Sequence, residues 1–183
     1  VLDIDSADKG ARFIRFCDSF HIPIITLIDT PGFLPGIDQE HHGVIRHGAK
    51  LIYAYAEATV PKVSIVLRKA YGGAYIVMNS KQLGGDLNFA LPKAEIAVMG
   101  PEAAIRIVFR KELAGAGNFE VAQKRLTEQY REQLTNPFIA AARGYIDDVI
   151  DPAECRKRLA LALESLKVKR QPVPSRKHGN MPV

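Results

Sequence analysis

Two glycine-rich turns hold the residues of this chain that are best suited to chemistry. Residues 31–36 (PGFLPG) follow one run of aliphatic residues, and residues 71–75 (YGGAY) follow another. Glycine lets the backbone approach a ligand closely, and a helix that begins at such a turn directs free amide N–H groups outward. Those amides suit a phosphate, or a carbonyl oxygen that gains negative charge during a reaction. We therefore expect a ligand site at these turns.

Charged residues beside the turns leave two interpretations open. Asp29 comes directly before Thr30 and Pro31, where an aspartate either caps the turn or takes part in catalysis. Arg68 and Lys69 come before the second turn, and they either hold an anion or form a solvated pair. The sequence identifies no acid–base pair.

Several other kinds of site are excluded by missing motifs. The chain has no Gly-x-Gly-x-x-Gly after a strand, no Gly-Lys-Ser/Thr and no Gly-x-Ser-x-Gly. A dinucleotide site, a nucleotide phosphate loop and a serine nucleophile elbow are therefore not expected. His42 and His47, which belong to a small cluster with His41, are five residues apart, whereas a spacing of four would place both on one helical face. We predict no metal site.

The elements that position the turns alternate between strand and helix. Strands are predicted at residues 22–28, 63–67, 95–99 and 145–150, and helices at 43–58, from about 101, at 119–134 and at 151–166. Another helix, capped by Asp5 and Ser6, precedes the first strand, and a short one runs from the second turn through Met78. This alternation predicts an α/β fold with mainly parallel strands, in which ligands collect where strands end and helices begin.

Helical periodicity also predicts which side chains face the core. In the first helix the inward set is Phe13, Phe16, Cys17 and Phe20. In the helix at 43–58 it is Ile45, Ala49, Ile52, Tyr53 and Ala56. In the helix that starts near Pro101 it is Ala104, Ile105, Val108 and Phe109. The strands at 22–28 and 63–67 are predicted to be buried.

The composition is that of an ordinary compact domain. Of the 183 residues, 47% are hydrophobic and 25% are charged, so a sizeable core can be buried. The apolar runs are far shorter than the ~20 residues of a membrane-spanning helix, and no signal segment is recognised. The two cysteines have no disulfide or metal spacing and indicate a reducing compartment. We expect a cytoplasmic protein, or a mitochondrial matrix protein in a eukaryote.

The formal net charge of +5 comes from the end of the chain. Residues 156–183 carry eight Lys or Arg and one Glu, a net charge of +7, while the rest carries −2. No aromatic residues lie among these charges, so a solvated helix face followed by a loose terminus is favoured over a nucleic-acid site. We predict one domain at residues 1–166, then an extended basic tail at 167–183.

Several long motifs resemble a known family. They resemble the carboxyltransferase β subunit of biotin-dependent acyl-CoA carboxylases, of the propionyl-CoA carboxylase type. The motifs that carry the resemblance are residues 5–17, 29–36, 46–51, 68–75, 94–100, 143–150 and 176–183. The resemblance implies the C-terminal half of that subunit, in a crotonase-like (ClpP/crotonase) α/β fold: a spiral of ββα units with surrounding helices. It also implies that the full-length subunit forms hexamers.

The resemblance implies transfer of a carboxyl group from carboxybiotin, on a separate biotin carboxyl carrier or biotin carboxylase subunit, to the α-carbon of propionyl-CoA or a similar short acyl-CoA. The N-terminal carboxyltransferase half of another subunit would hold the CoA. The backbone amides of Gly73 and Ala74 would be the catalytic groups, because they would stabilise charge on the ureido oxygen. Ile76 would face the acyl chain. The residues implied around biotin are Gly32, Phe33, Gly72 and Tyr75.

The residues also leave three different functions open. The chain can instead belong to a biotin-dependent acyl-CoA decarboxylase. It can be a hydratase or isomerase of the crotonase type, which would need a carboxylate such as Glu57 or Asp86 beside the second turn. It can also be a non-catalytic oligomerisation or carrier-docking module whose basic tail binds an acidic partner. As an isolated domain, the chain is expected to be inactive.

Overall fold

The computed structural model describes residues 1–172, 175 and 179–182. Within them, parallel strands form one sheet: β1 (Ile24–Thr30), β2 (Lys62–Tyr71), β3 (Leu87–Ala90), β4 (Glu95–Ala97) and β5 (Asp148–Val149). The strand order is β1-β2-β3-β5, and β4 pairs with β2 as well. The predicted α/β fold with parallel strands is confirmed.

Strand β2 lies at the centre of the sheet and leads directly into the second turn. Its residues 63–66 pair with β3, while its last residues, 69–71, pair with β4. β1 lies along its other side, and Thr30 is opposite Ala70. The carboxyl ends of β1 and β2 therefore lie side by side, so the two turns that follow them are brought together.

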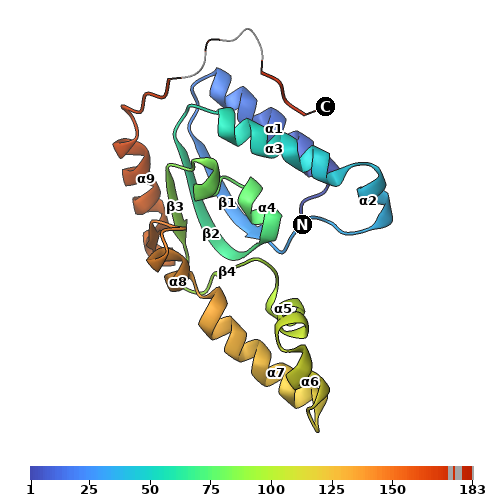
Figure 1. Cartoon of the computed structure of the whole chain (residues 1–183). Coiled ribbons are helices and arrows are strands. Elements are labelled where there is room, and N and C mark those ends of the chain that lie inside the picture. The colour runs from blue at the N-terminus through green and yellow to red at the C-terminus, as the bar shows by residue number, and fades with distance from the viewer. Residues whose placement is uncertain (173–174, 176–178, 183) are drawn as a thin grey trace.

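Helices cover both faces of the sheet. Helix α1 (Ile4–Ser19) packs beside α3 (Val44–Glu57) over one face, next to the short α4 (Gly72–Val77) (Figure 1). Helix α9 (Cys155–Ser165) covers the opposite face, where its Ala162 packs with Val63, Ile65 and Phe89. None of the helices among the described residues is long and apolar enough to cross a membrane.

A helical arm extends away from the sheet (Figure 1). It consists of α5 (Pro101–Val108), α6 (Arg110–Ala114) and α7 (Phe119–Tyr130), with a small core of Ile105, Leu113 and Leu126. A π-helical turn, η2 (Arg131–Thr135), and α8 (Pro137–Ala142) return the chain to the sheet. The remaining short elements are α2 (Ile37–His41), η1 (Lys81–Leu83) and η3 (Pro152–Glu154).

The predicted inward face of α1 was wrong except at Cys17. Phe13, Phe16 and Phe20 are 63%, 54% and 65% exposed. The buried residues are Ala7, Ala11, Ile14 and Cys17. The small residues are the buried ones because α1 lies close against α3. A Cβ added at Gly10 would be only 3.0 Å from Leu51. The helix is also capped by Asp3, in a capping box with Ser6, rather than by Asp5 and Ser6.

The predicted inward face of α3 was wrong as well. Ile45, Ile52 and Ala56 are exposed, and Ala49 and Tyr53 are half-buried. The buried residues are Val44, Gly48, Leu51, Ala54 and Tyr55. Gly48 explains the rotation, because the ring of Phe33 packs where its Cβ would be, 2.7 Å away. Contact with a distant loop therefore selects the buried face.

Other differences are local. β1 alternates between buried and exposed residues, so Ile25 and Leu27 are exposed, contrary to a fully buried strand. In the arm, Ala104 and Ile105 are buried as predicted, whereas Val108 is exposed. Strand β3 was not predicted from the sequence.

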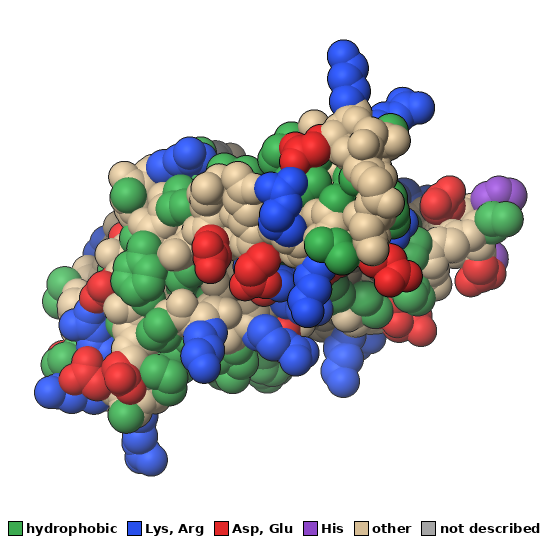
Figure 2. Space-filling model, turned by 90° about the horizontal axis from the view of Figure 1, so that it is seen from below, with side chains coloured by type: hydrophobic (Ala, Val, Ile, Leu, Met, Phe, Trp, Pro, Cys, Tyr) green, Lys and Arg blue, Asp and Glu red, His purple; other side chains and the backbone are tan. Residues whose placement is uncertain are grey.

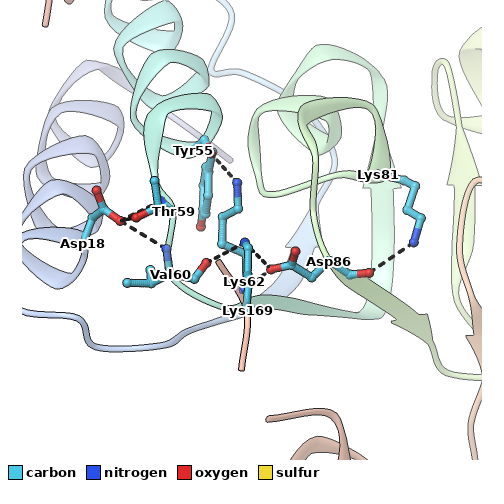
Figure 3. A network of polar contacts seen from close by, with 8 residues as sticks. All are labelled: Asp18, Tyr55, Thr59, Val60, Lys62, Lys81, Asp86 and Lys169. Atoms are coloured by element: carbon cyan, nitrogen blue, oxygen red, sulfur yellow. Dashed lines mark hydrogen bonds and ion pairs between the residues drawn. The ribbon is translucent and has the colours of Figure 1, made fainter. Parts of the chain in front are cut away.

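Hydrogen bonds from Lys169 and Asn180 attach the C-terminal segment to the rest of the molecule. The Lys169 ammonium donates to Val60 O at 3.0 Å and to Asp86 Oδ2 at 2.8 Å (Figure 3). Further on, Asn180 N donates to the Tyr53 hydroxyl at 2.7 Å. The described residues beyond 169 have neither helix nor strand, while 173–174, 176–178 and 183 of the predicted tail lie outside the described part. The division at residue 166 stays a prediction.

Candidate functional site

A cavity of about 540 Å³ opens at the carboxyl end of β2. The second turn and α4 supply one wall, and β4 and Val98 supply its floor. The opposite wall comes from the end of α7, from η2, and from α8 and the loop after it. From the turn and α4 the lining residues are Gly72, Gly73, Tyr75 and Ile76, four of the seven site residues predicted from the sequence.

Position 72 requires glycine, both for its backbone conformation and because a side chain would not fit there. Its φ is +59°, a left-handed conformation that a side chain rarely adopts, and a Cβ would lie 2.9 Å from Val98 O. Gly73 differs: a Cβ there would meet only the ring of Phe33, at 3.7 Å, an ordinary contact. The chain's own packing therefore leaves space at Gly73 for a ligand.

The backbone at Gly73 is the accessible part of the turn. Gly72, Gly73 and Ala74 form the first turn of α4, where N–H groups have no acceptor within the helix. Gly73 is exposed, whereas Ala74 is fully buried and does not line the cavity. Of the two amides that the resemblance implies, that of Gly73 is therefore the one open to a ligand.

Tyr75 lines the cavity, but its hydroxyl is buried away from it and unpaired. The residue is 4% exposed, and its hydroxyl has no hydrogen-bond partner. Burial raises the pKa of Tyr75 to about 12, so the group stays protonated and can donate a hydrogen bond. An unpaired buried hydroxyl costs about 1–3 kcal/mol.

Phe33 brings the first turn to the second. Its ring lies against Gly48 and beside Gly73, although it does not line the cavity. Gly32 precedes it, and Gly32 O accepts a hydrogen bond from Leu2 N at 3.0 Å. The two turns predicted from the sequence are therefore adjacent.

The cavity lining lacks a side chain suited to general acid–base catalysis near neutral pH. Among the described residues that line it, none is Asp, Glu, His, Cys or Lys. Its polar side chains are those of Gln82, Arg143 and the tyrosines Tyr75, Tyr130 and Tyr145. The side chains that this chain contributes to the cavity are thus hydrogen-bonding and apolar ones.

Asp29 has a structural partner. Its carboxylate accepts hydrogen bonds from Arg68 Nε and from Lys69 N, both at 3.2 Å, and thus ties the end of β1 to β2. The Arg68 hydrogen bond holds the pKa of Asp29 below its usual range. Arg68 is therefore paired with a carboxylate within the chain.

The other candidate side chains lie elsewhere. Asp86 accepts a hydrogen bond from Lys62 N at 2.7 Å, at the start of β2, whereas Gly72 follows its end. Glu57 is the last residue of α3, where it pairs with Arg15, and neither carboxylate lines the cavity. His47 pairs with Asp8, and the described residues contain no group of three or more His, Cys, Asp or Glu that could hold a metal ion.

Sequence reasoning missed the opposite wall of the cavity. Periodicity places Tyr130 and Leu134 only on one face of an amphipathic helix, and Arg143 and Tyr145 stand out only as part of a family motif. The motif at residues 143–150 was the one signal that pointed to this region, because periodicity says nothing about where a helix end is placed.

Comparisons with known proteins agree with these features. The family model for the carboxyl transferase domain matches residues 1–181. The carboxyltransferase subunit of propionyl-CoA carboxylase from Haloferax mediterranei is 59% identical over 183 residues, which are 100% of this chain and 36% of that protein. The methylmalonyl-CoA decarboxylase subunit alpha of Propionigenium modestum is 54% identical over 182 residues, 100% of this chain and 35% of that protein.

A solved structure matches the fold over the whole length of this chain. It is transcarboxylase 12S, described as a hexamer assembly with methylmalonyl-coenzyme A and methylmalonic acid bound. Its TM-score is 0.93 at 54% sequence identity, over 100% of this chain and 35% of that one. The chain thus spans about a third of the length of these relatives, less than the half that its motifs implied. The predicted resemblance is confirmed, and the chain belongs to the carboxyl transferase domain family.

Proposed function

We propose that this chain is the biotin-side part of an acyl-CoA carboxyltransferase and belongs to the C-terminal half of the complete subunit. The observation that carries the proposal is the cavity at Gly73, which joins an accessible backbone amide to a lining without an acid–base side chain. Such a site can stabilise developing charge on an oxygen but cannot itself remove a proton. A reaction in which the ligand brings the base fits this site best.

The cavity fits the ring system of biotin. Its volume of about 540 Å³ lies within the usual range for small-ligand sites. The Gly73 amide is a donor that suits a ureido oxygen, and Ile96 and Ile139 give apolar walls for the rest of the ring system. A bound carboxybiotin would supply CO2 and, once its N–CO2 bond has broken, a ureido nitrogen that can accept the α-proton of the acyl-CoA before the new C–C bond forms.

The chain's residues then have separate tasks. Gly73 N–H donates to the oxygen that gains charge, and Gly72 permits the turn that presents this amide. Ala74 stays behind Gly73 as a buried support of the same turn. Gly32 and Phe33 close the site beside Gly73, and Ile76 faces the acyl group.

The proposed substrate is propionyl-CoA or a similar short acyl-CoA. Support comes from the Haloferax mediterranei relative, which is a propionyl-CoA carboxylase subunit, and from transcarboxylase 12S, whose structure contains methylmalonyl-coenzyme A. We also propose a crotonase-like spiral of ββα units, oligomerisation as a hexamer in the complete subunit, and a biotin carrier protein as partner. The N-terminal half would hold the CoA.

Gly73→Val in the complete carboxyltransferase tests the oxyanion role. The branched side chain would fill the space in front of the amide, and loss of one such donor typically costs ~3 kcal/mol of transition-state stabilisation, or 10²–10³ in kcat. The measurement is the rate of carboxyl transfer to propionyl-CoA, with circular dichroism as the check on folding.

Gly73→Ala is the matched control, because its Cβ would have only the ordinary contact with Phe33. The fold should be kept in both variants, and the alanine variant should lose far less activity than the valine variant. Full activity in Gly73→Val would contradict the assignment of the Gly73 amide as the oxyanion donor.

The decarboxylase is the second candidate, since the Propionigenium modestum relative is a methylmalonyl-CoA decarboxylase subunit. Both reactions use the same site and differ in direction and in partner subunits. Carboxylation of propionyl-CoA that depends on a biotin carboxylase subunit would favour the carboxylase. Net loss of CO2 from methylmalonyl-CoA without that subunit would favour the decarboxylase.

A hydratase or isomerase activity and a docking role are both less well supported. A hydratase or isomerase would need a carboxylate at the turn, and neither Glu57 nor Asp86 lines the cavity. On the face that Figure 2 shows, basic, acidic and hydrophobic side chains are interspersed, so this face offers no uniform basic surface to an acidic partner. Docking through the basic tail at residues 167–183 stays a prediction.

A further inference from the structure

The wall of the cavity opposite α4 comes from residues at the base of the helical arm. Tyr130 and Leu134 belong to the base of the helical arm and lie far from Gly72 in the sequence. The arm has its own small core and extends away from the sheet (Figure 1). The width of the cavity therefore depends on how the base of the arm is fixed against β4.

Arg131 is the side chain that fixes it. Its Nε lies 3.0 Å from Glu95 Oε1 on β4, and its two terminal nitrogens lie 3.1 Å from Glu102 Oε1 on α5 and 3.3 Å from Glu128 Oε2 on α7. The side chains of Arg131 and Glu95 are 37% and 21% exposed, so their pair is less screened than a surface pair. One guanidinium thus joins the sheet to two helices of the arm.

The same network reaches the turn that carries Gly73. Glu95 also accepts a hydrogen bond from the hydroxyl of Tyr71, the residue directly before Gly72. Arg131 itself opens the π-helical turn that contains Leu134, and Thr135 Oγ1 closes this turn on Arg131 O at 2.8 Å. π-helical turns are rare and often occur at functional sites. A continuous set of contacts therefore links the two opposite walls of the cavity.

We propose that Arg131 is a positioning residue: by fixing the turn that carries Leu134, whose side chain lines the cavity together with Ile76, it limits the length of the acyl chain that the cavity accepts. The inference rests on the proposed function, because it takes the part of the cavity beside Ile76 to hold the acyl group next to biotin. The apolar side chains of Ile76 and Leu134 suit an alkyl chain. A planar guanidinium can reach three carboxylates at once, whereas a lysine ammonium cannot hold the same fork.

The test measures binding by isothermal titration calorimetry on the complete carboxyltransferase, with propionyl-CoA and hexanoyl-CoA as probes. Arg131→Met should shift the ratio of their dissociation constants by about tenfold in favour of hexanoyl-CoA, because a loosened wall admits the longer chain. Arg131→Lys should fall between the wild type and Arg131→Met. Arg125→Met is the matched control, since Arg125 lies on the adjoining helix α7 and pairs with Glu112 at 2.5 Å, outside the cavity lining.

Leu134→Ala keeps the test decisive if Arg131→Met fails to fold. It shortens the wall and leaves the Arg131 network in place, so the ratio should shift in the same direction. If the wild type binds propionyl-CoA but the ratio of the two dissociation constants is unchanged in Leu134→Ala and in folded Arg131→Met, this inference alone is overturned. A wild type that binds neither acyl-CoA would overturn the proposed function, and this inference with it.

Discussion

Single residues at the site differ in how far the sequence revealed them. Gly72 and Gly73 stand next to each other in one motif, yet only Gly72 is required by its backbone. Asp29 allowed two interpretations, and its hydrogen bonds to Arg68 and Lys69 favour the structural one. Tyr75 was expected near biotin from the family motif, but its unpaired hydroxyl is visible only in the folded chain.

Tyr75 should make stability depend on pH in the alkaline range. Its folded pKa of about 12 lies above the ordinary value of 10.0, so its contribution is fully present below pH 10 and is lost as the pH rises to 12. A pKa difference of this size corresponds to about 2–3 kcal/mol in the free energy of unfolding. Urea unfolding from pH 9 to 12 should show this decline, and the decline should be shallower in Tyr75→Phe, in which Tyr55 and Tyr71 keep their raised pKa values. An equally steep decline in Tyr75→Phe would contradict the assignment.

At the scale of elements, periodicity identified helices correctly but not their buried faces. Helix α1 has an aromatic stripe and a stripe of small residues, and both follow helical spacing. The small stripe is buried because Ala7, Gly10 and Ala11 let α1 approach α3. Apolar spacing alone could not distinguish the two stripes, since the deciding contact is with another helix.

Paired substitutions on α1 test this assignment. Ile14→Ala should destabilise the fold by about 2–5 kcal/mol, because a buried side chain leaves a cavity. Phe16→Ala should change stability by only about 0.5 kcal/mol, because more than half of this side chain is exposed. Urea denaturation of both variants gives the two values. A larger loss in Phe16→Ala than in Ile14→Ala would reverse the assigned face.

At the scale of the whole molecule, large apolar side chains remain uncovered. They include Phe13, Phe16 and Phe20 on α1 and Ile25 and Leu27 on β1. Exposed apolar patches of this kind commonly mark interfaces. The chain spans about a third of its relatives, and transcarboxylase 12S is a hexamer. We therefore propose that these side chains contact other protein surfaces.

The chain by itself should associate as its concentration rises. Sedimentation velocity should show larger species for the wild type, and Phe16→Asp combined with Phe20→Asp should return the chain to monomers. Val121→Asp provides the control, since Val121 is exposed on α7 in the helical arm, which extends away from the sheet and from α1. Association that persists unchanged in the double variant would place the contact elsewhere.

The sequence by itself determined the family, the α/β class and the two turns that meet at the site. These features reside in local patterns: glycine at a turn, apolar runs in strands, and long family motifs. The tertiary structure decided which helix faces are buried, which amide of the turn is accessible, and that the helical arm forms the opposite wall of the cavity. Those outcomes depend on contacts between residues far apart in the chain, such as Phe33 with Gly48 or Glu95 with Arg131. Local periodicity carries no information about such pairs, because their geometry exists only after the elements have packed.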